Sequence, residues 1–92
     1  MMFALRTESL EVRGQRLTVS ELTSGARVQW VRTTRESPDE SAPLLVSLCL
    51  LEPTATVDDV KGWPAEVLDE VAEAIMRVSG MEKAEGDGGK NA

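Results

Sequence analysis

The sequence predicts a mainly α-helical protein of the α+β class, with an N-terminal β-hairpin, three to four helices and a disordered acidic C-terminal tail. Three observations predict it: apolar residues alternate near the N-terminus, they recur at helical spacing further on, and residues 82–92 contain no large apolar side chain. A length of 92 residues suits one domain. We expect this domain to span residues 1–81, because the tail cannot bury enough surface to offset its ordering entropy.

The alternation that predicts the hairpin runs from Ser9 to Val19. Gly14 can take a positive φ in the turn Arg13-Gly14-Gln15. The apolar residues that share one face of the two strands are Leu10, Val12, Leu17 and Val19. A hairpin is barely stable alone in water, so it must pack on helices or on another copy of the chain.

Two helices are expected in the middle of the chain. The first is capped by Thr23 or Ser24 and continues to about Arg35. Its apolar residues at helical spacing are Ala26, Trp30 and Val31. The second spans about Ser41 to Glu52 and is apolar almost all round, which is typical of a buried central helix. A buried strand is the alternative for such a short run.

The C-terminal third predicts a short helical turn and a longer amphipathic helix. Thr56 caps the turn, and the long helix runs from Ala65 to Ser79 and closes at Gly80. Trp63 precedes Pro64 and is expected to pack against this helix. The inward residues of both segments are Val57, Val60, Val67, Leu68, Val71, Ala72, Ile75 and Val78.

The composition argues against an enzyme. The chain has no histidine, which excludes histidine-based triads and imidazole metal sites, and its single cysteine excludes a thiolate zinc site. The carboxylates lie mostly on the polar face of an amphipathic helix, where such groups are usually solvated. Cys49 lies in an apolar run and is expected to be a buried, inert thiol. We therefore expect no catalytic residues, no metal and no cofactor.

The charge distribution is uneven. Residues 1–36 contain six arginines and four glutamates, whereas residues 37–92 contain four basic and twelve acidic residues, for a net charge of −6. This asymmetry can orient a partner or another copy, but it argues against nucleic-acid binding, which needs a concentrated basic face. The longest apolar run, Leu44 to Leu51, is far shorter than the ~20 residues that span a bilayer. A soluble, cytoplasmic protein is expected.

A domain of this size has a marginal core, which favours self-association as a dimer or ring. Tryptophan is enriched at binding hot spots, and Trp30 lies between Arg27 and Arg32. The residues expected to form an exposed partner-binding or oligomer surface are Leu10, Val12, Leu17, Val19 and Trp30.

Two segments resemble the tail assembly chaperones of long-tailed bacteriophages. They are the helix entry Val19-Ser20-Glu21-Leu22-Thr23 and the stretch that begins Trp63-Pro64-Ala65-Glu66-Val67-Leu68 and ends Ser79-Gly80. The leucine-rich stretch between them fits the same pattern, and the resemblance covers about Ser9 to Met81. The residues 33–40 are more polar than that family's pattern.

The resemblance implies a small, mainly helical, non-enzymatic chaperone. Such a protein would bind the tape measure protein and recruit the major tail protein in the host cell cytoplasm, and would be absent from the mature virion. The family often makes a longer product by ribosomal frameshifting. Gly88-Gly89-Lys90 is compatible with a slippery codon run, although such a tail is also an ordinary solubilising segment.

The alternative is a small acidic regulatory module, either antitoxin-like or an anti-repressor. Its acidic C-terminal half would then occupy a basic partner in place of nucleic acid. Gene neighbours distinguish the two hypotheses, since tail genes indicate the chaperone and a toxin or repressor gene indicates the regulator.

Overall fold

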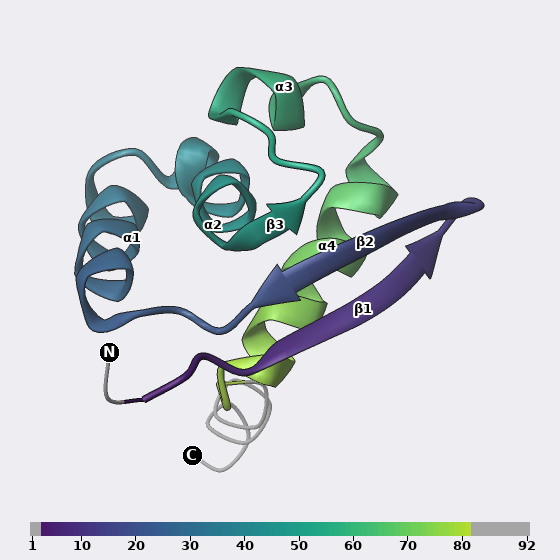
Figure 1. The fold of residues 1–92 in the computed structure, drawn as a ribbon. Coiled ribbons are helices and arrows are strands. Elements are labelled where there is room, and N and C mark those ends of the chain that lie inside the picture. The colour runs from purple at the N-terminus through teal and green to yellow at the C-terminus, as the bar shows by residue number, and fades with distance from the viewer. Residues whose placement is uncertain (1–2, 82–92) are drawn as a thin grey trace, which may run out of the picture.

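The computed structural model describes residues 3–81 and confirms the predicted class, a hairpin followed by helices (Figure 1). The elements in order are β1 (Thr7–Val12), β2 (Gln15–Ser20), α1 (Ser24–Glu36), the 3-10 helix η1 (Pro38–Glu40), α2 (Ser41–Cys49), β3 (Leu50–Glu52), α3 (Val57–Lys61) and α4 (Ala65–Val78). The predicted disordered tail lies outside the described residues.

The hairpin has the predicted facing of its apolar residues. Leu10 lies opposite Leu17 in the antiparallel β1–β2 pair. The turn is one residue shorter than expected, because Gln15 already pairs with Val12. Arg13 and Gly14 have φ values of 50° and 81°, a left-handed pair that suits the right-handed twist of the strands.

The second helix ends earlier than predicted. The helical expectation to Glu52 is wrong beyond Cys49, because the next three residues form strand β3 on the free edge of β2. Val19 pairs with Leu50 and Thr18 with Glu52, with an irregularity between them. Two causes favour the strand. Pairing with β3 gives hydrogen-bond partners to backbone groups along β2, and the helical conformation is disfavoured at Glu52 because this residue precedes a proline.

Local capping fixes the other helix ends. The Thr23 hydroxyl accepts a hydrogen bond from the Ala26 amide at 3.1 Å, which starts α1 as predicted. Thr56 and Asp59 form a reciprocal capping box at the start of α3. Gly80 follows α4 with φ of 78°, as expected for a helix-terminating glycine.

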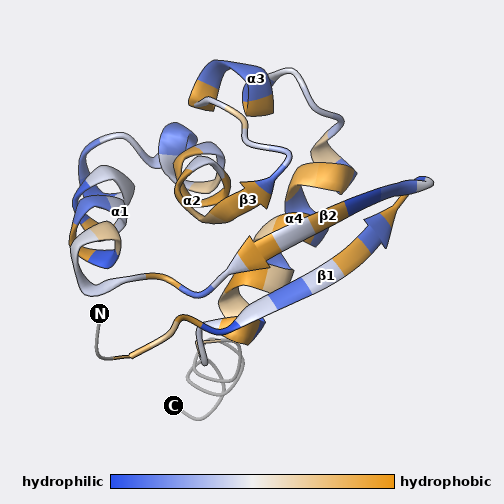
Figure 2. Cartoon of the chain, in the orientation of Figure 1, coloured by the Kyte–Doolittle hydropathy of each residue, from blue (hydrophilic) through white to orange (hydrophobic). Residues whose placement is uncertain are grey.

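The core lies between the sheet, α4 and α2. α4 packs on β1 and β2, α2 packs on α4, and α1 and α3 each pack on α2. In Figures 1 and 2, α4 crosses behind the hairpin and α1 lies on the side of α2 away from the sheet. The largest fully buried side chains are Leu45, Ile75, Val19, Val46, Val60, Val71 and Cys49.

Cys49 is buried, as predicted. Desolvation raises the pKa of its thiol to about 11, so almost none of it is thiolate near neutral pH.

One hydrogen bond connects two distant segments of the chain: the Leu22 amide donates to Ser79 Oγ at 3.0 Å. This bond joins the exit of β2 to the end of α4.

Candidate functional site

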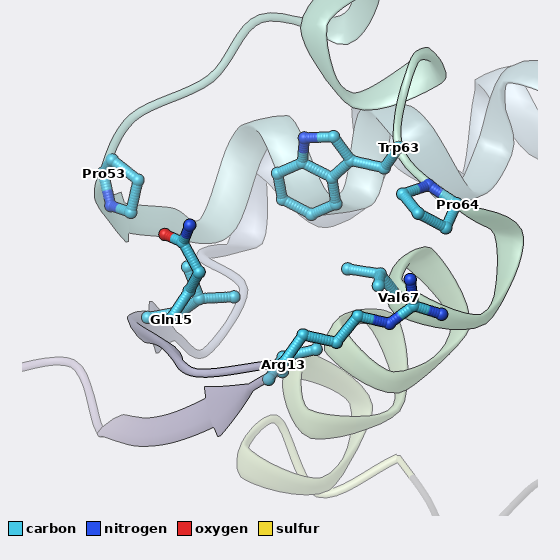
Figure 3. Close-up of a pocket in the computed structure, with 8 residues that line it drawn as sticks. Arg13, Gln15, Pro53, Trp63, Pro64 and Val67 are labelled. Atoms are coloured by element: carbon cyan, nitrogen blue, oxygen red, sulfur yellow. The ribbon is translucent and has the colours of Figure 1, made fainter.

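A pocket of about 350 Å³ opens between the hairpin turn and the start of α4 (Figure 3). Three separate segments build it: the hairpin turn, the residue after β3, and the entry to α4. The residues that line it are Val12, Arg13, Gln15, Leu17, Pro53, Trp63, Pro64 and Val67.

The pocket walls follow from local structure. Arg13 lies in the tight turn and Gln15 begins β2, while Pro64 is the N-cap of α4 and leaves Trp63 just in front of the helix. Trp63 and Val67 flank the opening from the α4 side in Figure 3, and Pro53 stands opposite. An indole, two prolines and aliphatic side chains make a surface suited to an apolar side chain.

The rim of the pocket carries charge. Arg13 Nη2 lies 3.4 Å from Glu66 Oε1, and both side chains are exposed. Exposed ion pairs of this kind contribute little to stability, so the Arg13 guanidinium can exchange Glu66 for another carboxylate. The arrangement can therefore accept an apolar side chain with an acidic neighbour.

The sequence prediction of an exposed apolar hairpin surface is wrong in its main part. Val12, Leu17 and Val19 are only 5%, 6% and 0% exposed. They are buried because α4 packs on the hairpin and β3 pairs with its edge within one chain, so no second copy is needed to cover them. Val12 and Leu17 nevertheless form part of the pocket wall, whereas Val19 belongs entirely to the core.

Leu10 and Trp30 are half-buried against the core of their own chain. Trp30 points from α1 to α2, where its Nε1 donates to the carbonyl oxygen and to Oγ of Ser41, both at 3.1 Å. Thr34 Oγ1 lies 2.7 Å from Ser41 Oγ and donates to the Trp30 carbonyl oxygen. Trp30 is therefore the anchor of α1, and its contact with a partner stays a prediction.

The outer face of α1 is a second exposed surface, which was not among the predicted binding residues. Val28 and Val31 are 57% and 41% exposed, although Val31 was grouped with Ala26 and Trp30 as one of the apolar residues at helical spacing. The residues that line a hollow on this face are Arg27, Val28, Val31, Arg32, Arg35 and Glu36. The signal was present in the sequence, since Val28 and Val31 are three residues apart with an arginine on either side.

Two titratable groups outside the pocket are perturbed by local hydrogen bonds. The Thr56 amide and hydroxyl lower the pKa of Asp59. Glu40 raises the pKa of Lys61, whose Nζ donates to Glu40 Oε2 at 2.8 Å. Both groups stabilise the structure around α3 and lie away from the residues that line the pocket.

Among residues 3–81, no group of histidine, cysteine or acidic side chains is arranged to hold a metal ion. Nor does any helix in that range have the length and apolar character to cross a membrane. Comparison with protein-family models, with curated proteins and with solved structures finds no match to this chain.

Proposed function

We propose that this chain is a non-enzymatic tail assembly chaperone of a long-tailed bacteriophage. It binds the tape measure protein and recruits the major tail protein while the tail tube assembles. It acts in the host cell cytoplasm and does not enter the mature virion. The proposal starts from the sequence resemblance of Val19–Thr23 and of the stretch from Trp63 to Gly80 to that family.

The pocket of Figure 3 is the observation that supports a binding role most directly. Trp63, Pro64 and Val67 belong to the segment that carries the resemblance, and they line an open apolar pocket in the described chain. A pocket of about 350 Å³ holds one or two bulky apolar side chains. Such a site suits reversible capture of one apolar face of a partner helix, which a chaperone must later release.

The test is co-expression with the tape measure protein and the major tail protein encoded near this gene. The chain is expected to keep the tape measure protein soluble and to co-purify with it. Val67→Glu, which places a charge in the pocket, is expected to abolish co-purification. The matched control is Arg16→Ala, an exposed position on β2 outside the pocket.

Folding of each variant is checked by circular dichroism, so that loss of binding is separated from loss of structure. If the wild-type chain fails to bind the tape measure protein, the chaperone proposal is wrong. If wild type and Val67→Glu bind it equally, the pocket is not the site.

Two further features belong to the same proposal. Self-association as a dimer or ring is tested by sedimentation equilibrium, and a strict monomer at high concentration contradicts it. A frameshifted longer product requires a slippery codon run across Gly88–Lys90, which lies outside the described residues. The nucleotide sequence of the gene decides that point directly.

One observation favours the alternative, a small acidic regulatory module. The exposed face of α4 carries four carboxylates within two turns, Glu66, Asp69, Glu70 and Glu73. A face of this kind can occupy a basic partner, as an antitoxin-like or anti-repressor protein would. A toxin or repressor gene beside this one, and binding of its product, would favour the alternative.

A further inference from the structure

The outer face of α1 carries two exposed valines within a group of arginines. Val28 lies on the opposite side of the helix from Trp30, the residue that anchors α1 to α2. Val31 follows one turn later, and Arg35 lies on the same face. α1 contains no fully buried residue, so most of this helix surface is open.

The arginines of this face are unusual in an acidic chain. The chain carries a net charge of −6, yet Arg27, Arg32 and Arg35 have no ion-pair partner among the described residues. Arg16 on β2 also lacks such a partner there, whereas Arg6, Arg13 and Arg77 each lie within 4.0 Å of a carboxylate. The α1 cations are therefore available to carboxylates of another molecule.

We propose that the outer face of α1 docks an acidic amphipathic helix of a partner protein. Val28 and Val31 meet an apolar stripe on that helix, while Arg27 and Arg32 pair with carboxylates on its two sides. Charge complementarity around an apolar centre is the usual arrangement of helix-on-helix recognition. This surface is separate from the Trp63 pocket, and the inference does not depend on the phage function.

A second copy of this chain fits the surface less well than such a partner. The acidic face of α4 offers the right charge, but no large apolar residue of α4 is exposed; the exposed large apolar residues of the described chain are Phe3, Leu5, Val28, Val31 and Leu51. Docking α4 there would leave the valines without an apolar contact, and exposed ion pairs contribute at most about 1 kcal/mol each.

Nucleic acid also fits the outer face of α1 less well than an acidic helix does. Two valines occupy the centre of the face, where a nucleic-acid surface would offer further polar or cationic groups to phosphates. The net charge of −6 also repels a polyanion at long range.

The test uses synthetic helical peptides of about 18 residues with one leucine stripe on an alanine-rich background. One peptide carries glutamates beside the stripe, and its matched control carries lysines there. Fluorescence anisotropy is expected to give saturable 1:1 binding of the acidic peptide, at least about tenfold tighter than the lysine peptide. Raising the salt concentration from about 0.05 to 0.5 M is expected to weaken this binding.

Variants of the protein locate the binding to α1. Arg27→Glu combined with Arg32→Glu is expected to reverse the preference, so that the lysine peptide binds more tightly. Val28→Ser combined with Val31→Ser is expected to weaken binding of both peptides. Arg16→Glu reverses a single arginine charge on β2, away from α1, and is the control for charge reversal, expected to leave binding unchanged.

Three results would overturn the proposal. The first is equal binding, or no binding, of the acidic and lysine peptides. The second is displacement of the acidic peptide by a short DNA duplex, which would assign the face to nucleic acid. The third is self-association of the chain that the two valine substitutions abolish, which would assign the face to a second copy.

Discussion

Replacing Trp30 with alanine is expected to release α1 from the rest of the fold without unfolding it. Trp30 is the half-buried residue through which α1 reaches the core, and its indole Nε1 donates to Ser41 at the start of α2. No residue of α1 is fully buried. The helix has 13 residues, a length that is marginal for an isolated helix in water.

The size of the effect follows from these contacts. A largely buried tryptophan removes on the order of 150 Å² of apolar area from water, worth roughly 4 kcal/mol. The indole hydrogen bond contributes about 1 kcal/mol more. Partial exposure reduces the sum, so we expect α1 to lose about 3 kcal/mol of docking free energy, or roughly a hundredfold in the opening equilibrium.

Hydrogen exchange measured residue by residue is the suitable assay. The amides of α1 are expected to lose roughly a hundredfold in protection, while those of α4 and β2 change less than about tenfold. Trp30→Phe keeps part of the aromatic area and loses the hydrogen bond, so its effect is expected to be intermediate. Gln29→Ala, at an exposed position of the same helix, is the control. Equal loss of protection in all elements would contradict this prediction, since α1 would then unfold only with the whole domain.

Four other predictions concern stability and reactivity. Thr56→Ala is expected to lower the unfolding free energy by about 1 kcal/mol in urea titration, because it removes a helix cap; an unchanged value contradicts this. The pKa of Asp59 is lowered from 3.8 by the Thr56 amide and hydroxyl, so its stabilising contribution is full above that pH and is lost as the pH falls through the lower folded value. Wild type and Asp59→Asn are therefore expected to differ in stability at about pH 6 and to converge at about pH 2. Burial raises the pKa of Cys49 to about 11, so a thiol reagent at about pH 8 is expected to react at least roughly a hundredfold faster in urea than with the native protein; equal rates would show that the thiol is accessible. Arg13→Asn is expected to stabilise the left-handed turn by roughly 0.5 kcal/mol and Gly14→Ala to destabilise it, as measured by thermal unfolding; the opposite signs would contradict the turn geometry.

Features that depend on neighbouring residues could be read from the sequence. The position of Leu10 opposite Leu17 follows from the alternation of apolar and polar residues on both sides of a turn that contains glycine. The cap at Thr23 and the closing Gly80 are signals contained within a few residues of each helix end. The burial of Cys49 follows from the apolar run around it.

The end of α2 could not be read in this way. Leu50 and Leu51 continue an apolar run that suits a helix or a buried strand equally. The edge of β2, more than 30 residues away, decides between them, because its backbone groups gain hydrogen bonds from an extended segment.

Periodicity, capping and composition were enough to predict a small hairpin-and-helix domain with an acidic balance, because each of these signals is read from neighbouring residues or from the chain as a whole. Which apolar residues are available to other molecules depended instead on how the elements pack in three dimensions. This packing placed the hairpin valines under α4, left Val28 and Val31 outside, and brought Gln15, Pro53 and Trp63 to one pocket. The reason is that the exposure of a side chain depends on which elements pack together. Among the large side chains of α1, only Trp30 packs against the core.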